Sequence, residues 1–370
     1  MDIDKDLTVL LTLFDRPGFT SRWLTYANKI SFPFKVLIAD GGKDKSVEEL
    51  LSSPASFPNV NFQYLRYPYD KDRTTFNAKV DDALSKVETQ FVVRADDDDF
   101  YFVDGLRESI RFLRDNPNYG MCRGQNGRFV LRPEPDQTFG KEVEFIVEAF
   151  VESNEQETAS LRVKRNFSRY DLTHYDMHRT GDMQRYYRIS KELDMKDAIL
   201  AELLASSLAV IDSPSKRNTS LYLMRQVNIG GSSAVREGKK HGDFFDRMFL
   251  ESWSMEFSKF SNVLAENIAK KDGISVREAL ILIKDEFRKF IAPYIFDSIA
   301  PEDRSLLSKV RKVIFNMDQD SVIRKVSRRT WHWFQDCADN VSRPRPVYPS
   351  SPYFKDILPV YEYLTDRKMG

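Results

Sequence analysis

Short runs of apolar residues alternate with longer segments of helical periodicity through the first hundred residues of the chain. The apolar runs are rich in Val, Ile, Leu and Phe, which is typical of strands buried on both faces of a sheet. These predicted strands lie at 7–14, 34–39, 60–65 and 91–95. The segments between them predict helices, at 19–29, 46–51 and 74–87. Because alternating strands and helices form βαβ units, the pattern predicts an α/β fold with a mostly parallel central sheet and flanking helices.

Beyond residue 100 the alternation continues and then gives way to helices. We expect further helices and strands at 104–114, 119–123, 170–178, 195–210 and 221–225. The segment 124–167 fits neither pattern, and we interpret it as an insertion. From residue 244 the periodicity is helical, with two long helices, two more after Pro301 and a short one at the C-terminus. We therefore predict an α/β domain at 1–242 and an all-α C-terminal region at 243–370.

Two of the predicted helix starts carry the pattern of a capping box. In this motif a Ser side chain and a Glu side chain three residues later each bond to the other's backbone. Ser46 and Glu49 form the first pair, and Ser275 and Glu278 form the second. The second pair follows Gly273, where we expect the preceding helix to end.

The overall charge is balanced, because Lys plus Arg and Asp plus Glu both number 56 in 370 residues. That balance argues against a protein held on nucleic acid by bulk charge. The two cysteines, Cys122 and Cys337, suggest neither a disulfide framework nor a metal site, which favours the reducing cytoplasm. The acidic N-terminal residues lack the basic segment of a signal peptide, and no apolar run is long enough to span a bilayer. Peripheral contact with a membrane stays open.

The chemistry is concentrated where the predicted strand at 91–95 runs into four consecutive carboxylates, Asp96 to Asp99. Four anions at the end of a buried strand repel one another unless a cation lies among them. Their oxygens are hard ligands that suit Mg²⁺ or Mn²⁺, and ligands of open α/β sheets gather at the carboxyl ends of strands. A calcium loop is excluded, because Tyr101 or Phe102 would take the position that requires glycine.

These residues and the order of elements resemble the GT-A glycosyltransferases, most closely the family 2-like bacterial enzymes. The likeness rests on a first strand followed by Arg16-Pro17, a second strand that ends in Asp40, and the run from Arg94 to Phe100. It covers about the first 240 residues. The resemblance implies a transferase that takes a sugar from a nucleotide-sugar, with a divalent cation that neutralises the diphosphate leaving group.

The resemblance also implies roles for individual residues. Asp40 would contact the base or the ribose of the nucleotide. Asp96/Asp98 and Asp97/Asp99 both satisfy the D-x-D pattern of the family; we expect Asp96 and Asp98 to bind Mn²⁺ or Mg²⁺, with Asp98 as a direct ligand. Further candidates to contact the nucleotide are Asn77, Lys79, Arg94, Asp96 and Asp97.

An acceptor hydroxyl needs a general base if the transfer inverts the anomeric carbon. In inverting relatives an acidic residue on a late helix, about a dozen residues before a glycine turn, has that role. Glu202 has this spacing to the turn at 212–214 and lies off the apolar face of its helix, and Asp197 is the second candidate. An exposed helix glutamate and a first-turn carboxylate are the alternative interpretations. The Glu-Asp or Asp-Asp pair of the family is missing at this place.

Several basic residues are candidates for the metal or the phosphates. His241 lies in the loop Gly238-Lys239-Lys240-His241-Gly242, and some GT-A enzymes use a late histidine as an extra metal ligand. His178 could approach the acceptor or the diphosphate, whereas His332 lies in an aromatic cluster typical of a core. Candidates to hold phosphate are Arg225, Arg236, Lys239 and Lys240.

The sequence thus predicts a metal-dependent glycosyltransferase, with a UDP-sugar as the favoured donor. The resemblance favours a glycan or lipid-linked saccharide acceptor and a role in bacterial surface polysaccharide synthesis. A nucleotidyltransferase that makes nucleotide-sugars is one alternative, although the residues after the first strand, 15–19, are not the Gly-rich phosphate loop it needs. A non-catalytic module that binds glycans or nucleotides is the other. The number of subunits stays open.

Overall fold

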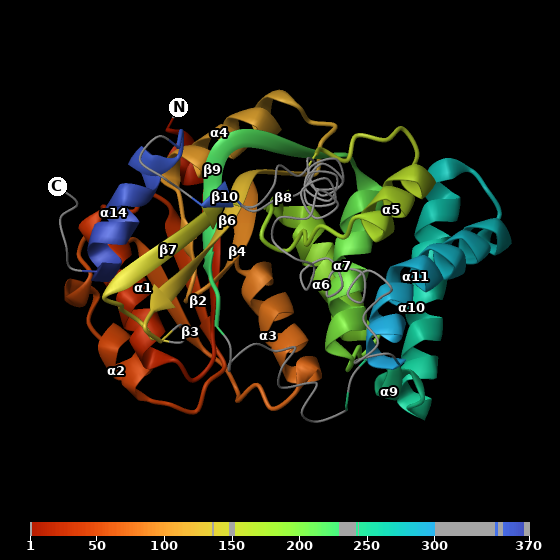
Figure 1. The fold of residues 1–370 in the computed structure, drawn as a ribbon, viewed down its shortest axis with the longest axis horizontal. Helices are drawn as coiled ribbons and strands as arrows, with labels where there is room; N and C mark the ends of the chain where they lie inside the picture. Colours follow the sequence, from red (N-terminus) through yellow and green to blue (C-terminus); the bar gives the residue numbers. More distant parts are fainter. Residues whose placement is uncertain are drawn as a thin grey trace, which may run out of the picture.

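The computed structural model describes residues 2–134, 137–147, 152–228, 242, 244–299, 345–346 and 351–365. Across these residues one mixed ten-stranded sheet runs through the molecule, with helices on both faces (Figure 1). Its main path has the strand order β10-β7-β6-β8-β4-β1-β2-β3, and β9 pairs with both β5 and β6. The predicted α/β fold with a helical C-terminal region is confirmed.

Four parallel strands form the part of the sheet that carries the acidic residues. They are β1 (Leu7–Leu13), β2 (Lys35–Asp40), β3 (Phe62–Arg66) and β4 (Phe91–Asp96). In the centre, β1 pairs with β2 on one side and with β4 on the other, so that Leu13 lies opposite Asp40 and Thr12 lies opposite Asp96. The two aspartates therefore end the strands on either side of β1, at the same edge of the sheet.

Both faces of β1 are buried, which explains why its sequence is apolar without alternation. On one face Leu7, Val9 and Leu11 pack into a core with α1 (Pro17–Lys29), α2 (Ser46–Leu51) and α4 (Val103–Asp115). On the other face Leu10 packs with α3 (Arg73–Ser85) and α6 (Thr180–Glu192). Burial of this kind is the main force that holds such a sheet between its helices.

The remaining strands extend the sheet beyond β4. Strand β8 (Met177–Arg179) joins β4 to β6 (Met121–Arg132), and β6 also pairs with β7 (Glu142–Val147) and β9 (Ser215–Gln226). Strand β5 (Phe100–Tyr101) pairs with the far end of β9. The segment that we interpreted as an insertion contributes the second half of β6, β7 and α5 (Ala159–Ser168) to this architecture; its status as an insertion stays a prediction.

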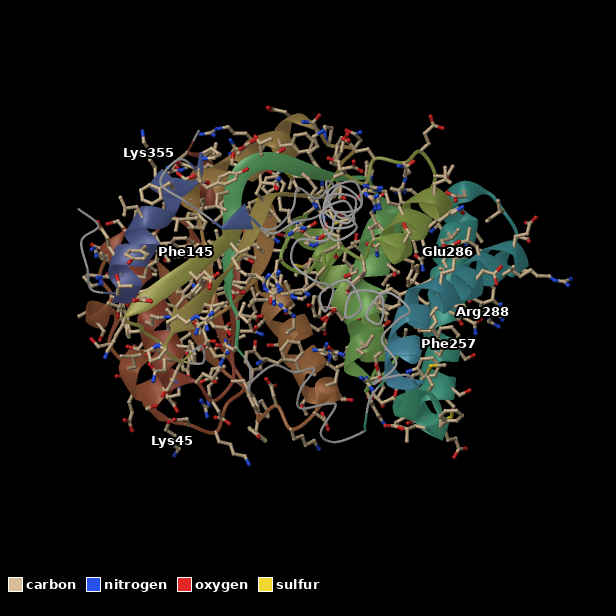
Figure 2. The ribbon with its side chains drawn as sticks, in the orientation of Figure 1. Lys45, Phe145, Phe257, Glu286, Arg288 and Lys355 are labelled. Carbon is tan, nitrogen blue, oxygen red and sulfur yellow. The ribbon has the colours of Figure 1, made fainter. Side chains whose placement is uncertain are left out.

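Helices from both sides of the predicted boundary at residue 242 share a second core. Helix α10 (Glu251–Asp272) and α11 (Val276–Ile299) pack against α5 and α7 (Ala198–Asp212), with the short α9 (Phe244–Met248) beside them. The phenyl rings of Phe257 on α10 and Phe287 on α11 lie 4.6 Å apart, and Figure 2 shows Phe257 within this helical layer. The boundary itself stays a prediction.

The last described helix, α14 (Phe354–Thr365), lies at the opposite end of the molecule from α10 and α11 (Figure 1). Its buried residues Ile357, Val360 and Leu364 pack near β7 and α1. The two-residue β10 (Arg345–Pro346) pairs with β7. Charged side chains such as Lys45, Arg288 and Lys355 extend from the surface, whereas Phe145 lies inside (Figure 2). Among the helices that the structure describes, none has the length and apolar character needed to cross a bilayer.

Candidate metal and nucleotide site

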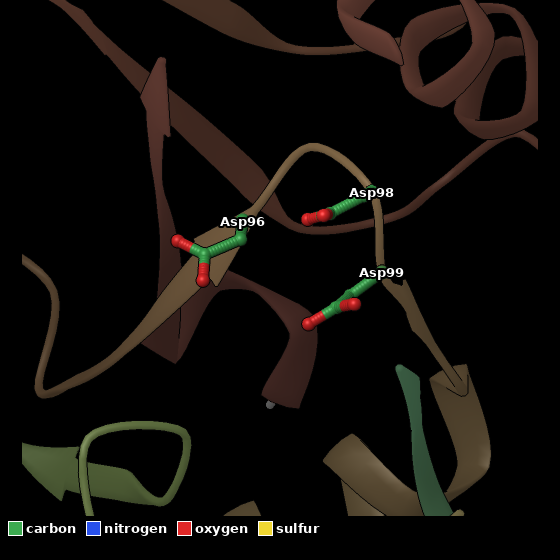
Figure 3. Close-up of side chains that lie close together, drawn as sticks. All are labelled: Asp96, Asp98 and Asp99. Carbon is green, nitrogen blue, oxygen red and sulfur yellow. The ribbon is translucent and has the colours of Figure 1, made fainter. Parts of the chain in front are cut away.

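The four carboxylates form a turn that brings three of them together. Strand β4 ends at Asp96, and the backbone N–H of Asp99 donates to the carbonyl of Asp96 over 3.4 Å. One carboxylate oxygen each from Asp96, Asp98 and Asp99 lies within 4.8 Å of the other two. Figure 3 shows these three side chains beside one another at the end of β4 and in the turn that follows it. We call residues 96–99 the acidic turn.

The carboxylate of Asp97 is directed away from this group and into the protein. Its side chain has no exposed surface, and it accepts hydrogen bonds from the Thr20 hydroxyl (2.9 Å) and from Arg16. Burial raises the pKa of Asp97 to about 7, although the positive charge of Arg16 opposes that shift. Asp97 was a candidate to contact the nucleotide; the structure instead turns it toward α1.

Asp98 is held by a cation and an amide. Arg16 donates to its two carboxylate oxygens over 2.7 and 3.2 Å, and the Asn228 amide donates over 2.6 Å. The Arg16 side chain is one-third exposed, so it covers the turn from the solvent side. Arginine suits this position because its planar fork bonds to two carboxylates at once.

Asp96 and Asp99 lie in contrasting surroundings. Asp96 accepts from Thr12 (3.2 Å) and from the Tyr175 hydroxyl (2.7 Å), and Arg94 lies 3.9 Å away. Burial opposes its ionisation, but Arg94 and the Tyr175 hydrogen bond hold its pKa below the usual value. For Asp99, burial and the charge of Asp98 raise the pKa well above normal, against the attraction of Arg225, whose nitrogen lies 3.5 Å from the carboxylate.

These residues fit a hard divalent cation. Three carboxylates supply oxygen ligands, and the repulsion from Asp98 that helps to raise the pKa of Asp99 would be relieved by positive charge. Asp96 and Asp98, which we expected to bind the metal, belong to this group. Asp99 was missed as a candidate ligand, because a D-x-D pattern in an extended chain places it with Asp97.

Asp40 ends β2, on the other side of β1 from β4, and has polar partners of its own. It accepts from the backbone N–H of Gly42 (2.8 Å), from the Tyr64 hydroxyl (2.8 Å) and from Arg66. Its side chain is almost fully buried, whereas about a quarter of the Arg66 side chain is exposed. A carboxylate with donors on both oxygens is fixed in orientation, which suits a group that must recognise a ligand.

Lys79 and Asn77 on α3 are both buried rather than open to a ligand. The Lys79 ammonium donates to the carbonyl of Leu13 (3.1 Å) and pairs with Asp70, and burial lowers its pKa. The Asn77 amide donates weakly to the carbonyl of Met195 (3.5 Å). Both were candidates to contact the nucleotide; in the structure they connect α3 to the end of β1 and to the segment before α7.

Basic side chains gather around Asp96 and Asp99. Arg94 donates to the Tyr187 hydroxyl (3.1 Å), and Arg225 lies over the ring of Tyr175 at 4.4 Å. Burial, together with the charges of Arg94, Arg225 and Arg73, lowers the pKa of His174 far below normal. Anionic groups would be favoured beside such a group of cations.

The two candidates for the general base both lie on or next to α7. Asp197 is the N-cap of the helix, accepts from the backbone N–H groups of Ile199 and Leu200 (both 2.9 Å), and pairs with Arg247. Glu202 is half-buried and accepts from the Tyr170 hydroxyl (3.2 Å). The contacts of Asp197 are those of a structural cap, so Glu202 remains the stronger candidate; neither role is tested by the geometry.

Other residues named from the sequence have simpler outcomes. His178 is buried on β8, where its Nε2–H donates to the carbonyl of Thr173 over 2.7 Å. Five further candidates from the sequence lie outside the described ranges: Arg236, Lys239, Lys240, His241 and His332. Arg16 was missed as a site residue, and the Arg-Pro pair after β1 was the signal that could have found it.

The sequence matches no established protein-family model, and no curated protein matches it. The fold, however, resembles that of S. aureus TarS. One TarS structure aligns with a TM-score of 0.50 and 15% identity, over 77% of this chain and 43% of TarS. TarS 1–349 in complex with UDP-GlcNAc aligns with a TM-score of 0.51 and 14% identity, over 78% of this chain and 73% of that one.

The chain thus spans less than half of the longer TarS structure. Sequence identities this low give information about the fold alone. The resemblance to family 2-like enzymes therefore stays a prediction. With the strand order, the aspartates at the ends of β2 and β4 and this structural likeness together, the chain has the GT-A fold of glycosyltransferases.

Proposed function

We propose that the protein is a metal-dependent glycosyltransferase that takes its sugar from a nucleotide-sugar, with a UDP-sugar as the favoured donor. The observation that carries the proposal is the convergence of Asp96, Asp98 and Asp99 at the carboxyl end of β4. In an open α/β sheet, ligands bind at this edge. Asp40 lies at the same edge, at the end of β2, which β1 separates from β4. The likeness to a TarS structure that contains UDP-GlcNAc supports the choice of donor.

The acidic turn would hold Mn²⁺ or Mg²⁺ through Asp96, Asp98 and Asp99. When bound, the cation would neutralise charge on the diphosphate leaving group. Arg94, beside Asp96, and Arg225, beside Asp99, would attract the same anionic group. Asp40, held by Tyr64 and Arg66, would orient the nucleoside. Glu202 is the proposed general base for the acceptor hydroxyl in an inverting transfer.

We propose a glycan or a lipid-linked saccharide as the acceptor and bacterial surface polysaccharide as the product. Exposed apolar residues near the start of α10, Phe249 and Met255, are compatible with peripheral contact to a lipid-linked acceptor. These finer assignments rest on the resemblance to the family 2-like enzymes.

The test is thermal unfolding of the full chain with a panel of nucleotides and nucleotide-sugars, with and without Mn²⁺. A ligand that binds the native state alone raises Tm by mass action. We expect UDP and one UDP-sugar to raise Tm in a Mn²⁺-dependent way, and Asp98→Asn to abolish the shift. Slow metal-dependent hydrolysis of that UDP-sugar without an acceptor would support a transferase, and binding without hydrolysis would support a non-catalytic module. No shift with any nucleotide would contradict the proposal.

A further inference from the structure

Arg22 lies on α1 beside the acidic turn, and only 2% of its surface is exposed. Its guanidinium donates to the backbone carbonyl of Asp98 (2.8 Å), to the side-chain carbonyl of Gln226 (2.7 Å) and to the backbone carbonyl of Thr138 (2.9 Å). These acceptors belong to three segments that are far apart in the sequence: the acidic turn, the end of β9 and the connection between β6 and β7. One side chain therefore joins all three.

The surroundings of Arg22 indicate that packing alone does not explain an arginine at this position. The guanidinium lies against the rings of Phe19 (4.9 Å) and Phe100 (5.1 Å), and burial lowers its pKa to about 10 although the acidic turn raises it. It remains a cation at neutral pH, and its hydrogen bonds are with neutral carbonyls. A buried charge costs free energy that an apolar residue of similar volume would avoid.

Through its hydrogen-bond partners, Arg22 acts on two of the three converging aspartates. The bond to the Asp98 carbonyl fixes the peptide group between Asp98 and Asp99. This peptide group joins the two Cα atoms that carry the side chains. Gln226, the second acceptor, donates its backbone N–H to the Asp99 carboxylate over 3.0 Å. Neither contact uses a carboxylate oxygen of Asp98, whose side-chain partners are Arg16 and Asn228 instead.

We propose that Arg22 is a positioning residue that holds Asp98 and Asp99 in the arrangement that binds the divalent cation; this inference rests on the proposed function. A metal site loses affinity when its ligands move by a fraction of an ångström, so the groups that orient the ligands matter almost as much as the ligands. Lysine cannot replace this arginine fully, because an ammonium lacks the planar fork that reaches three separated acceptors.

The test compares Mn²⁺ binding with stability in the full chain, using Arg22→Met, Arg22→Lys and a matched control, Arg162→Met. Arg162 is also buried, 4% exposed, and donates to backbone carbonyls alone, among them those of Val210 and Ile211. Free Mn²⁺ is measured by electron paramagnetic resonance during titration, and the free energy of unfolding by urea. We expect Arg22→Met to weaken Mn²⁺ binding by about 10- to 100-fold, Arg22→Lys by less, and Arg162→Met not at all although it too loses stability.

Folded Arg22→Met with the wild-type Kd for Mn²⁺ would overturn the inference. If that variant does not fold, Arg22→Lys and Gln226→Leu decide: wild-type Mn²⁺ affinity in both overturns the inference, and a weakened affinity in both supports it. Failure of the proposed function looks different, because then the wild-type chain and Asp98→Asn would bind Mn²⁺ equally weakly. A loss of affinity in Arg162→Met equal to that in Arg22→Met would mean that general destabilisation is the cause, and would also overturn the inference.

Discussion

Two clusters of aspartate and arginine, both within the described residues, are built differently. The first, which we call the closed quartet, consists of Arg123, Arg217, Asp171 and Asp176. Each aspartate pairs with both arginines; Asp176, for example, lies 3.1 Å from Arg123 and 2.9 Å from Arg217. The arginines come from β6 and β9, and the aspartates come from the segment before β8. Charges of both signs are equal in number, and three of the four side chains are at most 4% exposed.

The acidic turn has a different balance. Its four aspartates are consecutive, three of their carboxylates converge, and the arginines around it approach from the outside. In the closed quartet every charge meets its partner within the protein, which indicates a structural role. In the acidic turn like charges face one another, which is costly for folding and is typical of a site that binds a cation. The comparison teaches that the arrangement of the charges, rather than their number, separates a structural cluster from a binding site.

The largest expected effect comes from breaking the closed quartet. Arg217→Met leaves Asp171 and Asp176 with Arg123 alone, and an uncompensated buried charge typically costs about 3–5 kcal/mol. We expect a loss of that size in the free energy of unfolding, measured by urea at pH 7. Mn²⁺ binding by the fraction that stays folded should not change, because within the described residues no hydrogen bond or ion pair joins the quartet to the acidic turn.

The double variant Arg217→Met/Asp176→Asn removes one charge of each sign and serves as the control. It should recover part of the lost stability, since a buried pair can be replaced at little cost when both partners go. If Arg217→Met unfolds at the same urea concentration as the wild type, the quartet does not stabilise the fold, and the contrast between the two clusters fails.

Asp98→Asn should have the opposite profile, with a large loss of activity and little loss of stability. Removal of one electrostatic contact to the developing charge typically lowers the rate about 10²- to 10³-fold. Stability should change by less than about 1 kcal/mol, because the amide keeps an oxygen acceptor for Arg16 and one repelling charge disappears. The measurements are metal-dependent UDP-sugar turnover and urea unfolding.

Asp104→Asn is the matched control for this variant, because the Asp104 side chain is 92% exposed at the start of α4. It should leave both the rate and the stability at wild-type values. An Asp98→Asn variant with full turnover would contradict the metal role of the acidic turn. A loss of stability as large as that of Arg217→Met would mean that the turn is a structural cluster like the quartet.

The strands and the acidic turn could be predicted because their signals are local. Strands β1 and β4 are buried on both faces, so their apolar runs are continuous and their ends are clear. The partners of the turn could not be predicted in the same way. Arg16 and Thr20 lie some eighty positions before Asp97 in the sequence, and the inward direction of Asp97 is a property of the turn that a D-x-D spacing does not encode.

The two capping boxes show the same limit on a smaller scale. At the start of α11 the pattern is correct: the Glu278 side chain accepts from the backbone and hydroxyl of Ser275, and the Ser275 hydroxyl accepts from the backbone of Glu278. At α2 the prediction is wrong. The Ser46 hydroxyl donates to Asp44 instead (2.7 Å), because a carboxylate two residues earlier competes for it. Identical spacings thus gave different structures when one neighbour differed.

A smaller effect concerns pH and the histidine next to the quartet. Burial lowers the pKa of His178 to about 4, with Arg217 adding to the shift and the Thr173 carbonyl and Asp182 opposing it. Between pH 6.5 and 4, His178 of the unfolded chain binds a proton that native His178 does not. The free energy of unfolding therefore falls as pH falls, by up to about 1.4 kcal/mol per pH unit, and this effect levels off below pH 4. His178→Gln keeps an N–H donor for Thr173. The difference in unfolding free energy between wild type and this variant should therefore depend on pH over that range; a constant difference would show that folding does not shift the pKa of His178.

The smallest effect should come from Arg16, which supplies positive charge to the acidic turn from the solvent side. Without metal, Arg16→Gln removes the cation that bonds to Asp97 and Asp98, and we expect a loss of about 1.5 kcal/mol, near the lower limit for such bonds because the side chain is one-third exposed. Saturating Mn²⁺ supplies charge to the same carboxylates, so the loss should shrink when urea unfolding is repeated in its presence. Arg16→Lys, which keeps the charge, should show a smaller loss under both conditions. Equal losses with and without Mn²⁺ would mean that Arg16 and the metal do not act on the same charges, and the acidic turn would then resemble the closed quartet more than a binding site.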